Sequence, residues 1–216
     1  MSAPSPELKR RVLSAVHTEP APTRSAVRRR GWLTFGVCAA IALAIFAWAG
    51  GARIYDRPGL LVVWTSVGWI VAASAAAALG VARGRSMLGR STAALAVLLV
   101  ALPPALLAWK IGVTAPFGAD MTAPWPGRPG FRCLGLSLAM AAPLLVALFV
   151  MRRGSDPVHT GIAGAVLGVT AGVAAGALVD LWCPVAHLPH VLLGHILPLV
   201  LVALIGAWVG RRLLPP

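Results

Sequence analysis

Long apolar stretches, separated by short polar segments, dominate the pattern of the chain. An α-helix needs roughly 20 mostly apolar residues to cross a bilayer, so stretches of this length predict transmembrane helices. Six segments qualify, at residues 32–50, 60–82, 93–112, 134–151, 160–182 and 191–210. The pattern therefore predicts an all-α membrane protein with an N-terminal tail (1–31), a six-helix transmembrane domain (32–210) and a short C-terminal end (211–216).

Composition supports a membrane protein and argues against a soluble one. The 216 residues are 58% hydrophobic and 12% charged, with a mean hydropathy of +0.83, which lies outside the range of soluble globular domains. A net charge of +13 would suggest nucleic-acid binding in a soluble protein. Here, however, most of the basic residues lie in the segments before, between and after the predicted spans. We therefore expect no direct contact with nucleic acid.

The basic residues are concentrated on one side of the predicted spans. Most of the 19 lie before the first span, in the second and fourth loops and at the C-terminus: Lys9, Arg10, Arg11, Arg24, Arg28, Arg29, Arg30, Arg83, Arg85, Arg90, Arg152, Arg153, Arg211 and Arg212. Since cytoplasmic loops carry an excess of Lys and Arg, both termini are predicted to be cytoplasmic. A cleaved signal peptide is the rival interpretation of the first span, but its leader is long and five more spans follow.

The N-terminal tail contains a short amphipathic helix followed by a linker. Ser5, Pro6 and Glu7 form a helix start signal, with a capping residue, a proline at the first position and an acidic first turn. Four apolar residues then share one face, which Arg11 and other basic residues flank: Leu8, Val12, Leu13 and Val16. The proline-containing segment 18–24 ends the helix and favours an extended linker. This apolar stripe suits a groove in a partner protein and, equally, the surface of an anionic membrane.

Small residues mark one face of the fifth predicted span. Glycine recurs there at every fourth position, at Gly164, Gly168, Gly172 and Gly176. One face of this helix is therefore nearly bare backbone, which lets another helix approach closely. We interpret the stripe as a packing face and not as a phosphate-binding loop.

Two cysteines lie at the predicted outer ends of neighbouring spans. Cys133 precedes the fourth span and Cys183 follows the fifth, at similar depth, because these spans form a hairpin joined on the cytoplasmic side. A disulfide between them is geometrically plausible in the oxidising compartment outside the membrane. A functional thiol pair and a merely structural disulfide are equal alternatives. Cys38, inside the first span, is interpreted as a small apolar filler.

Histidines follow the second of these cysteines at spacings that suit metal binding. His187 and His190 lie four and seven residues after Cys183, and His195 lies five residues further on. Together with Cys133 and Cys183, His187 and His190 form a candidate site for zinc or a related metal. A proline interrupts any single helical face, so ordinary packing and hydrogen bonding are the competing interpretation of the histidines. No resident cofactor is expected, and a transient metal ion at this Cys/His cluster is the one candidate.

Sequence motifs for catalysis are absent. The chain contains no CxxC, HExxH, G-x-S-x-G or P-loop motif, so we expect neither an enzyme nor a small-molecule substrate. No Asp, Glu, Lys or Arg lies near the middle of a predicted span, which disfavours an ion-coupled carrier. A small-solute or ion transporter of the inner membrane is the alternative function.

Four segments together resemble the NrsF-type membrane anti-sigma factors. They are PELKRRVLSAV at residues 6–16, FRCLGL at 131–136, LWCP at 181–184 and GAWVGRRLL at 206–214. The resemblance covers nearly the whole chain and is strongest from Arg132 to Leu214. The histidine-rich segment VAHLPHVLLGH, at residues 185–195, departs from the more acidic and aromatic stretch of the family pattern.

This resemblance implies a multi-pass protein of the bacterial inner membrane that holds an extracytoplasmic-function (ECF) sigma factor inactive. The sigma factor and the lipid bilayer are then the expected partners. The family's two periplasmic cysteines map onto Cys133 and Cys183, which implies that these thiols either take part in sensing an envelope, metal or redox stress or maintain a conformation that responds to it. The residues expected to bind the sigma factor are Leu8, Arg11, Val12, Leu13 and Val16.

Overall fold

The described part of the chain is helical and contains no strands. The computed structural model describes residues 5–7, 10–11, 14, 23–52, 57–80, 91–117, 130–152, 159–183 and 185–214. Within these ranges, six helices are long and apolar enough to span a membrane. The all-α class and the six spans predicted from the sequence are therefore confirmed.

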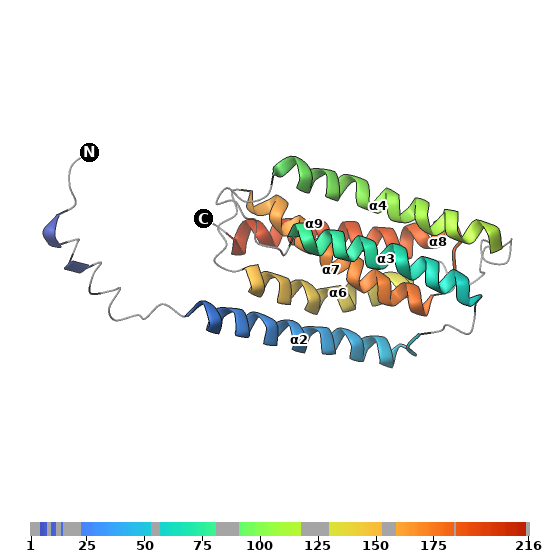
Figure 1. The fold of residues 1–216 in the computed structure, drawn as a ribbon, viewed down its shortest axis with the longest axis horizontal. Helices are drawn as coiled ribbons and strands as arrows, with labels where there is room; N and C mark the ends of the chain where they lie inside the picture. Colours follow the sequence, from blue (N-terminus) through green and yellow to red (C-terminus); the bar gives the residue numbers. More distant parts are fainter. Residues whose placement is uncertain are drawn as a thin grey trace.

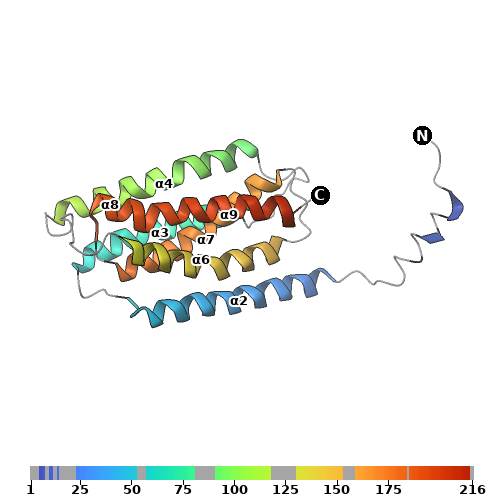
Figure 2. The same cartoon turned by 180° about the vertical axis from the view of Figure 1, so that it is seen from behind.

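The long helices alternate in direction along the bundle (Figure 1). In chain order they are α2 (Arg24–Trp48), α3 (Gly59–Gly80), α4 (Thr92–Thr114), α6 (Phe131–Arg152), α7 (Thr160–Trp182) and α9 (Leu197–Leu213). A 3-10 turn, η2 (Ala115–Phe117), follows α4, whereas α8 (Leu188–Val191) and the π-helix η3 (Leu192–Ile196) lead into α9. The start of α2 and the end of α9 consequently lie at the same end of the bundle (Figure 2).

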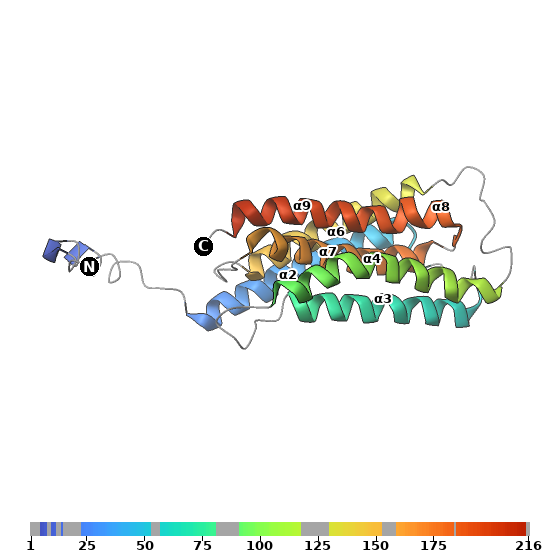
Figure 3. The same cartoon turned by 90° about the horizontal axis from the view of Figure 1, so that it is seen from above.

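Helix α7 lies at the centre of the bundle (Figure 3). In the most apolar 18-residue segment of α7, 67% of the residues are buried. The corresponding share is 17% in the segments that contain α2 and α4. Helix α7 packs against α9, α3 and α6, whereas α2 packs mainly on α6. The peripheral helices therefore leave apolar side chains on their outer faces, including Val100 of α4 and Trp48 of α2. Such faces suit contact with lipid.

The glycine stripe of α7 brings α9 into backbone contact. A Cβ atom at Gly164 would overlap the carbonyl oxygen of Gly206, and one at Gly168 would overlap that of Val202. Further along, Gly176 lies against a tryptophan ring of α3. The close helix approach expected from the four-residue spacing is present, and it fixes the position of α9 along α7.

The first helix begins earlier than the hydropathy pattern indicates. The apolar span is predicted from residue 32, but α2 starts at Arg24 because the Thr23 hydroxyl accepts a hydrogen bond from the Ala26 amide at 3.3 Å. This is an N-cap, and it supplies the helix start that the apolar pattern does not show. Arginines 28–30 therefore belong to the same helix as the first span.

The N-terminal tail is described in part. Five described residues between positions 6 and 14 are helical, and the guanidinium of Arg11 pairs with the carboxylate of Glu7 one turn earlier, at 3.0 Å. The apolar stripe falls outside the described residues: Leu8, Val12, Leu13 and Val16. Its role as a binding surface stays a prediction.

Candidate functional site

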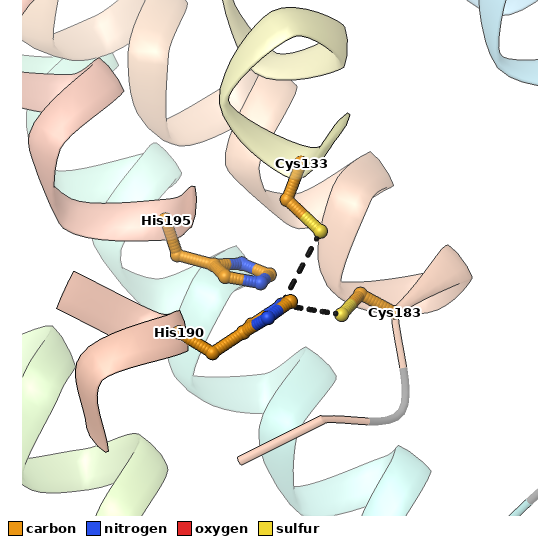
Figure 4. Close-up of side chains that lie close together, drawn as sticks. All are labelled: Cys133, Cys183, His190 and His195. Atoms are coloured by element: carbon orange, nitrogen blue, oxygen red, sulfur yellow. Dashed lines mark hydrogen bonds between the residues drawn. The ribbon is translucent and has the colours of Figure 1, made fainter. Parts of the chain in front are cut away.

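Four side chains, one from α6 and three from the segment after α7, meet closely (Figure 4), at the end of the bundle opposite to the start of α2. They are Cys133 at the start of α6, Cys183 directly after α7, His190 in α8 and His195 in η3. Each offers one sulfur or ring nitrogen, and these atoms all lie within 4.8 Å of one another. None of the four residues is more than 4% exposed. The Nε2 atom of His190 lies 3.4 Å from the sulfur of Cys133 and 3.1 Å from that of Cys183.

The two thiols are close together but are not joined by a disulfide bond. Hydrogen bonding with Cys133 lowers the pKa of the Cys183 thiol far below its usual range, burial opposes this shift, and hydrogen bonding with His190 adds to it. A thiolate at this position is both a nucleophile and a soft metal ligand. The pair therefore has the chemistry for metal ligation and for disulfide formation. Cys38 lies in α2 and is not one of the four clustered residues.

Two glycines allow α6 to approach η3 closely enough for this contact. Gly130, directly before α6, has a φ of +104°, and a Cβ atom there would lie 3.1 Å from the carbonyl oxygen of His190. A Cβ atom at Gly194 would lie 2.8 Å from the Cβ atom of Cys133. Larger residues at these positions would push Cys133 away from the histidines.

A π-helical turn brings the two histidines to the same side. Residues five apart point about 140° away from each other in an α-helix. Here the amide of Leu197 donates to the carbonyl of Leu192, five residues earlier, and this wider turn aligns His190 with His195. Their ring centroids are 5.8 Å apart.

Pro198 explains why the helix is interrupted at this point. A proline has no N–H to donate to the carbonyl four residues earlier, which belongs to Gly194. That carbonyl accepts a hydrogen bond from the Ser137 hydroxyl of α6 instead, at 3.4 Å. The irregular turn is therefore held by a neighbouring helix, next to Cys133.

Three charged side chains are buried beside the cluster. Asp180, one turn before Cys183, accepts a hydrogen bond from the ammonium group of Lys110 in α4 and lies 3.8 Å from the guanidinium of Arg57. Arg57 also donates to the backbone carbonyls of Asp180, at 2.5 Å, and Cys183, at 3.5 Å. It thereby satisfies carbonyl groups at the C-terminus of α7. The sequence pattern does not predict this group, although Lys110 and Asp180 lie near the outer ends of predicted spans and Arg57 lies in the first outer loop.

The end of α7 is also attached to α2. The indole N–H of Trp182 donates to the carbonyl of Ala49, directly after α2, at 2.9 Å. The guanidinium of Arg132 lies 4.8 Å from the centre of the Trp182 ring, a distance that suits a cation–π contact. The residue next to Cys183 therefore joins α2, α6 and α7.

The structure brings together three of the four metal-ligand candidates from the sequence, namely Cys133, Cys183 and His190. His187 is partly exposed and is not one of the four clustered residues. His195 occurs in the cluster in its place. This difference follows from the fold, because His187 precedes α8, whereas His190 lies in α8 directly before the widened turn and His195 lies within that turn.

A family model described as negative regulator of sigma F matches residues 15–215. The matched range contains all six long helices and the complete Cys/His cluster. The chain belongs to the NrsF family. Neither a curated protein nor a solved structure matches it.

Membership of the NrsF family identifies this protein as a negative regulator of a sigma factor, with a sigma factor as its partner. The family is thus one of regulators. The match begins at residue 15, so most of the residues expected to bind the partner precede it: Leu8, Arg11, Val12 and Leu13. The six apolar helices make the NrsF-family chain a multi-pass membrane protein.

Proposed function

We propose that this NrsF-family protein is an anti-sigma factor of the bacterial inner membrane, which sequesters an ECF sigma factor and releases it on an envelope, metal or redox signal. The observation that carries the proposal is the buried contact among Cys133, Cys183 and His190. This cluster lies where α6 starts and α7 ends, at the opposite end of the bundle from the start of α2, which follows the tail in the sequence.

The distribution of charge supports an orientation with both termini in the cytoplasm. Exposed arginines mark the end of the bundle where α2 starts and α9 ends: Arg28, Arg29, Arg30, Arg211 and Arg212. Cytoplasmic segments next to spans are enriched in such residues. The Cys/His cluster is then at the periplasmic end, in an oxidising compartment where thiol chemistry responds to stress.

The tail is the proposed binding surface for the sigma factor. Its apolar stripe covers an apolar groove on the partner, and Arg11 with its basic neighbours pairs with acidic residues around that groove. The stripe consists of Leu8, Val12, Leu13 and Val16. A sigma factor held in this way is kept at the membrane and away from promoters.

A short chain of contacts supports transmission of a signal from the thiols to the tail. Cys183 is adjacent to Trp182, whose indole is bonded to Ala49 at the outer end of α2. Helix α2 continues without a break to Arg24, beside the tail. Oxidation or metal binding at Cys183 would therefore bias the position of α2. A hundredfold change in affinity requires only about 2.7 kcal/mol of coupling between the two sites.

Capture of the sigma factor by the tagged full-length protein tests this function. The protein is isolated in detergent from cells before and after exposure to cadmium or an oxidant, and bound ECF sigma factor is quantified by mass spectrometry. We expect Val12→Asp to reduce capture at least about tenfold, because it places a charge in an apolar interface. Ser14→Asp adds the same charge on the opposite face of the helix and should leave capture unchanged.

The same experiment tests sensing by the thiols. Wild-type protein and the Cys38→Ser control should lose the sigma factor after stress, whereas Cys133→Ser and Cys183→Ser should not respond. Equal capture by the Val12 and Ser14 variants would remove the tail from the proposal. A normal stress response in both outer cysteine variants would refute sensing at these thiols.

A further inference from the structure

His195 lies in η3 at the Cys/His cluster and is buried. Both of its ring nitrogens lack a hydrogen-bond partner among the described residues, although the side chain is only 2% exposed. Buried polar groups are almost always hydrogen-bonded, because an unsatisfied one is costly. One of these nitrogens belongs to the group of atoms within 4.8 Å of one another, together with both outer sulfurs. An ion bound among these atoms would give this nitrogen a partner.

We propose that Cys133, Cys183, His190 and His195 together bind one Zn²⁺ or a closely related d¹⁰ divalent cation in tetrahedral coordination. Two thiolates and two imidazoles are an established donor set for closed zinc sites, whereas Mg²⁺ and Ca²⁺ require oxygen ligands. Zinc–ligand bonds of about 2.0–2.3 Å place tetrahedral ligand atoms roughly 3.3–3.8 Å apart. The two sulfur–nitrogen distances of 3.1 and 3.4 Å are already close to this spacing.

The charge of such a site suits its buried location. Two thiolates neutralise a divalent cation, so the complex adds no net charge to the interior. Four protein ligands complete the tetrahedron and leave no open position for water. Structural zinc sites are closed in this way, whereas catalytic zinc sites keep one position open. The ion would join α6, the end of α7 and the α8–η3 segment. This inference deepens the proposed function, and it rests on that function for its regulatory meaning: gain or loss of the ion is the signal.

Asp180 is the positioning residue of this site. Its Oδ1 atom is held by Lys110, whereas Oδ2 has no hydrogen-bond partner among the described residues and has only its ion pair with Arg57 at 3.8 Å. His195 is one of the groups that interact electrostatically with the carboxylate. Metal-bound histidines commonly donate their second ring N–H to a carboxylate, which fixes the ring. Oδ2 is the acceptor that His195 would use.

Titration of the reduced, chelator-treated full-length protein in detergent with Co²⁺ tests the site. Tetrahedral coordination with thiolates gives intense visible bands and a thiolate-to-cobalt charge-transfer band, and Zn²⁺ should abolish both by competition. We expect one Co²⁺ per chain. Cys133→Ser, Cys183→Ser and His195→Ala should each weaken binding at least about a hundredfold, since each removes a ligand. His187→Ala, which changes the nearby histidine outside the cluster, should bind like the wild type.

Two further variants separate ligation from folding. His195→Cys should restore tetrahedral binding with a stronger charge-transfer band, because it replaces one ligand by another. In a Lys110→Met background, the negative charge of Asp180 and the positive charge of Arg57 cancel. In this background, Asp180→Asn should weaken Co²⁺ binding about 10- to 100-fold without changing the tetrahedral spectrum. This result would identify Asp180 as a positioning residue and not as a ligand.

An octahedral spectrum, absence of saturable binding, or equal losses in the His187 and His195 variants would overturn the proposed site. The outcome is independent of the capture experiment, because the titration contains no sigma factor. Failure to bind Co²⁺ together with normal capture of the sigma factor would reject the metal site alone. Metal binding without capture would retain the site and reject the anti-sigma mechanism.

Discussion

Helix α7 has two halves that differ in how they are held. From Gly164 to Gly176 it contacts its neighbours through glycine backbone, with no titratable side chain in the segment. From Asp180 to Cys183, the residue directly after the helix, the chain contacts them through a carboxylate, an indole N–H and a thiol. The first half depends on shape, whereas the second depends on groups whose bonding changes with protons, metals or oxidants.

The two parts of α7 are therefore expected to have different roles. Close-packed backbone cannot adapt by small steps, so the glycine half keeps α7 and α9 in a fixed register. The polar half has bonds that can be remade, and α6, α8 and the end of α2 are attached to it. Chemistry at the outer end is therefore expected to move these attached segments while the centre of the bundle stays unchanged.

The largest effect is expected from removing the charge on Asp180. Asp180→Asn leaves Lys110 and Arg57 buried without their anion, and breaking a buried ion pair in this way costs about 3–5 kcal/mol. The free energy of unfolding, measured by denaturant titration of the purified protein in detergent, should fall by this amount.

The matched control for this variant is Lys110→Met combined with Asp180→Asn. It removes one charge of each sign, and the remaining Arg57 keeps its backbone carbonyl partners. The double variant should be more stable than Asp180→Asn alone, and it should lose less than the sum of the losses of Asp180→Asn and of Lys110→Met measured separately, which would show coupling between the two charges. Additive losses would mean that the two side chains do not stabilise each other.

A smaller effect is expected from filling the glycine half. A Cβ atom at Gly168 would overlap the carbonyl oxygen of Val202, so Gly168→Ala should lower the free energy of unfolding by about 1–3 kcal/mol. A Cβ atom at Gly135 of α6 would meet no neighbouring atom of the described structure within 4 Å. Gly135→Ala should therefore be neutral or stabilising, since alanine favours helix by up to about 1 kcal/mol over glycine. Thermal unfolding of the two variants checks this, and equal losses would contradict the packing role of the stripe.

The two halves also differ in how much the sequence alone predicts. The glycine spacing is a local pattern, and it correctly indicates a close helix contact, although not which helix provides it. The apolar lengths likewise predict the six helices, and the positions of Cys133 and Cys183 at the ends of two hairpin-joined spans predict their closeness. These features depend on one helix or one hairpin at a time.

The remaining features of the polar half depend on contacts between distant segments. The spacing alone does not place His195 beside His190, because residues five apart diverge on a regular helix. The π-turn that aligns the two histidines requires Pro198 and a hydroxyl from α6. The pairing of Lys110 with Asp180 is likewise not visible in the sequence pattern, since the two residues are 70 positions apart and lie in different spans.

The smallest effect should come from the hydroxyl that supports the π-turn. Ser137→Ala removes the donor to the Gly194 carbonyl, and loss of one such hydrogen bond costs about 0.5–1.5 kcal/mol. Amide hydrogen exchange should show faster exchange in residues 192–197 and unchanged exchange in residues 164–176, because the glycine half does not depend on this bond. Ser74→Ala, on an exposed position of α3, provides the control. Equal acceleration in both segments would show that the two halves of α7 respond as one unit, and would remove the distinction between a fixed and an adjustable half.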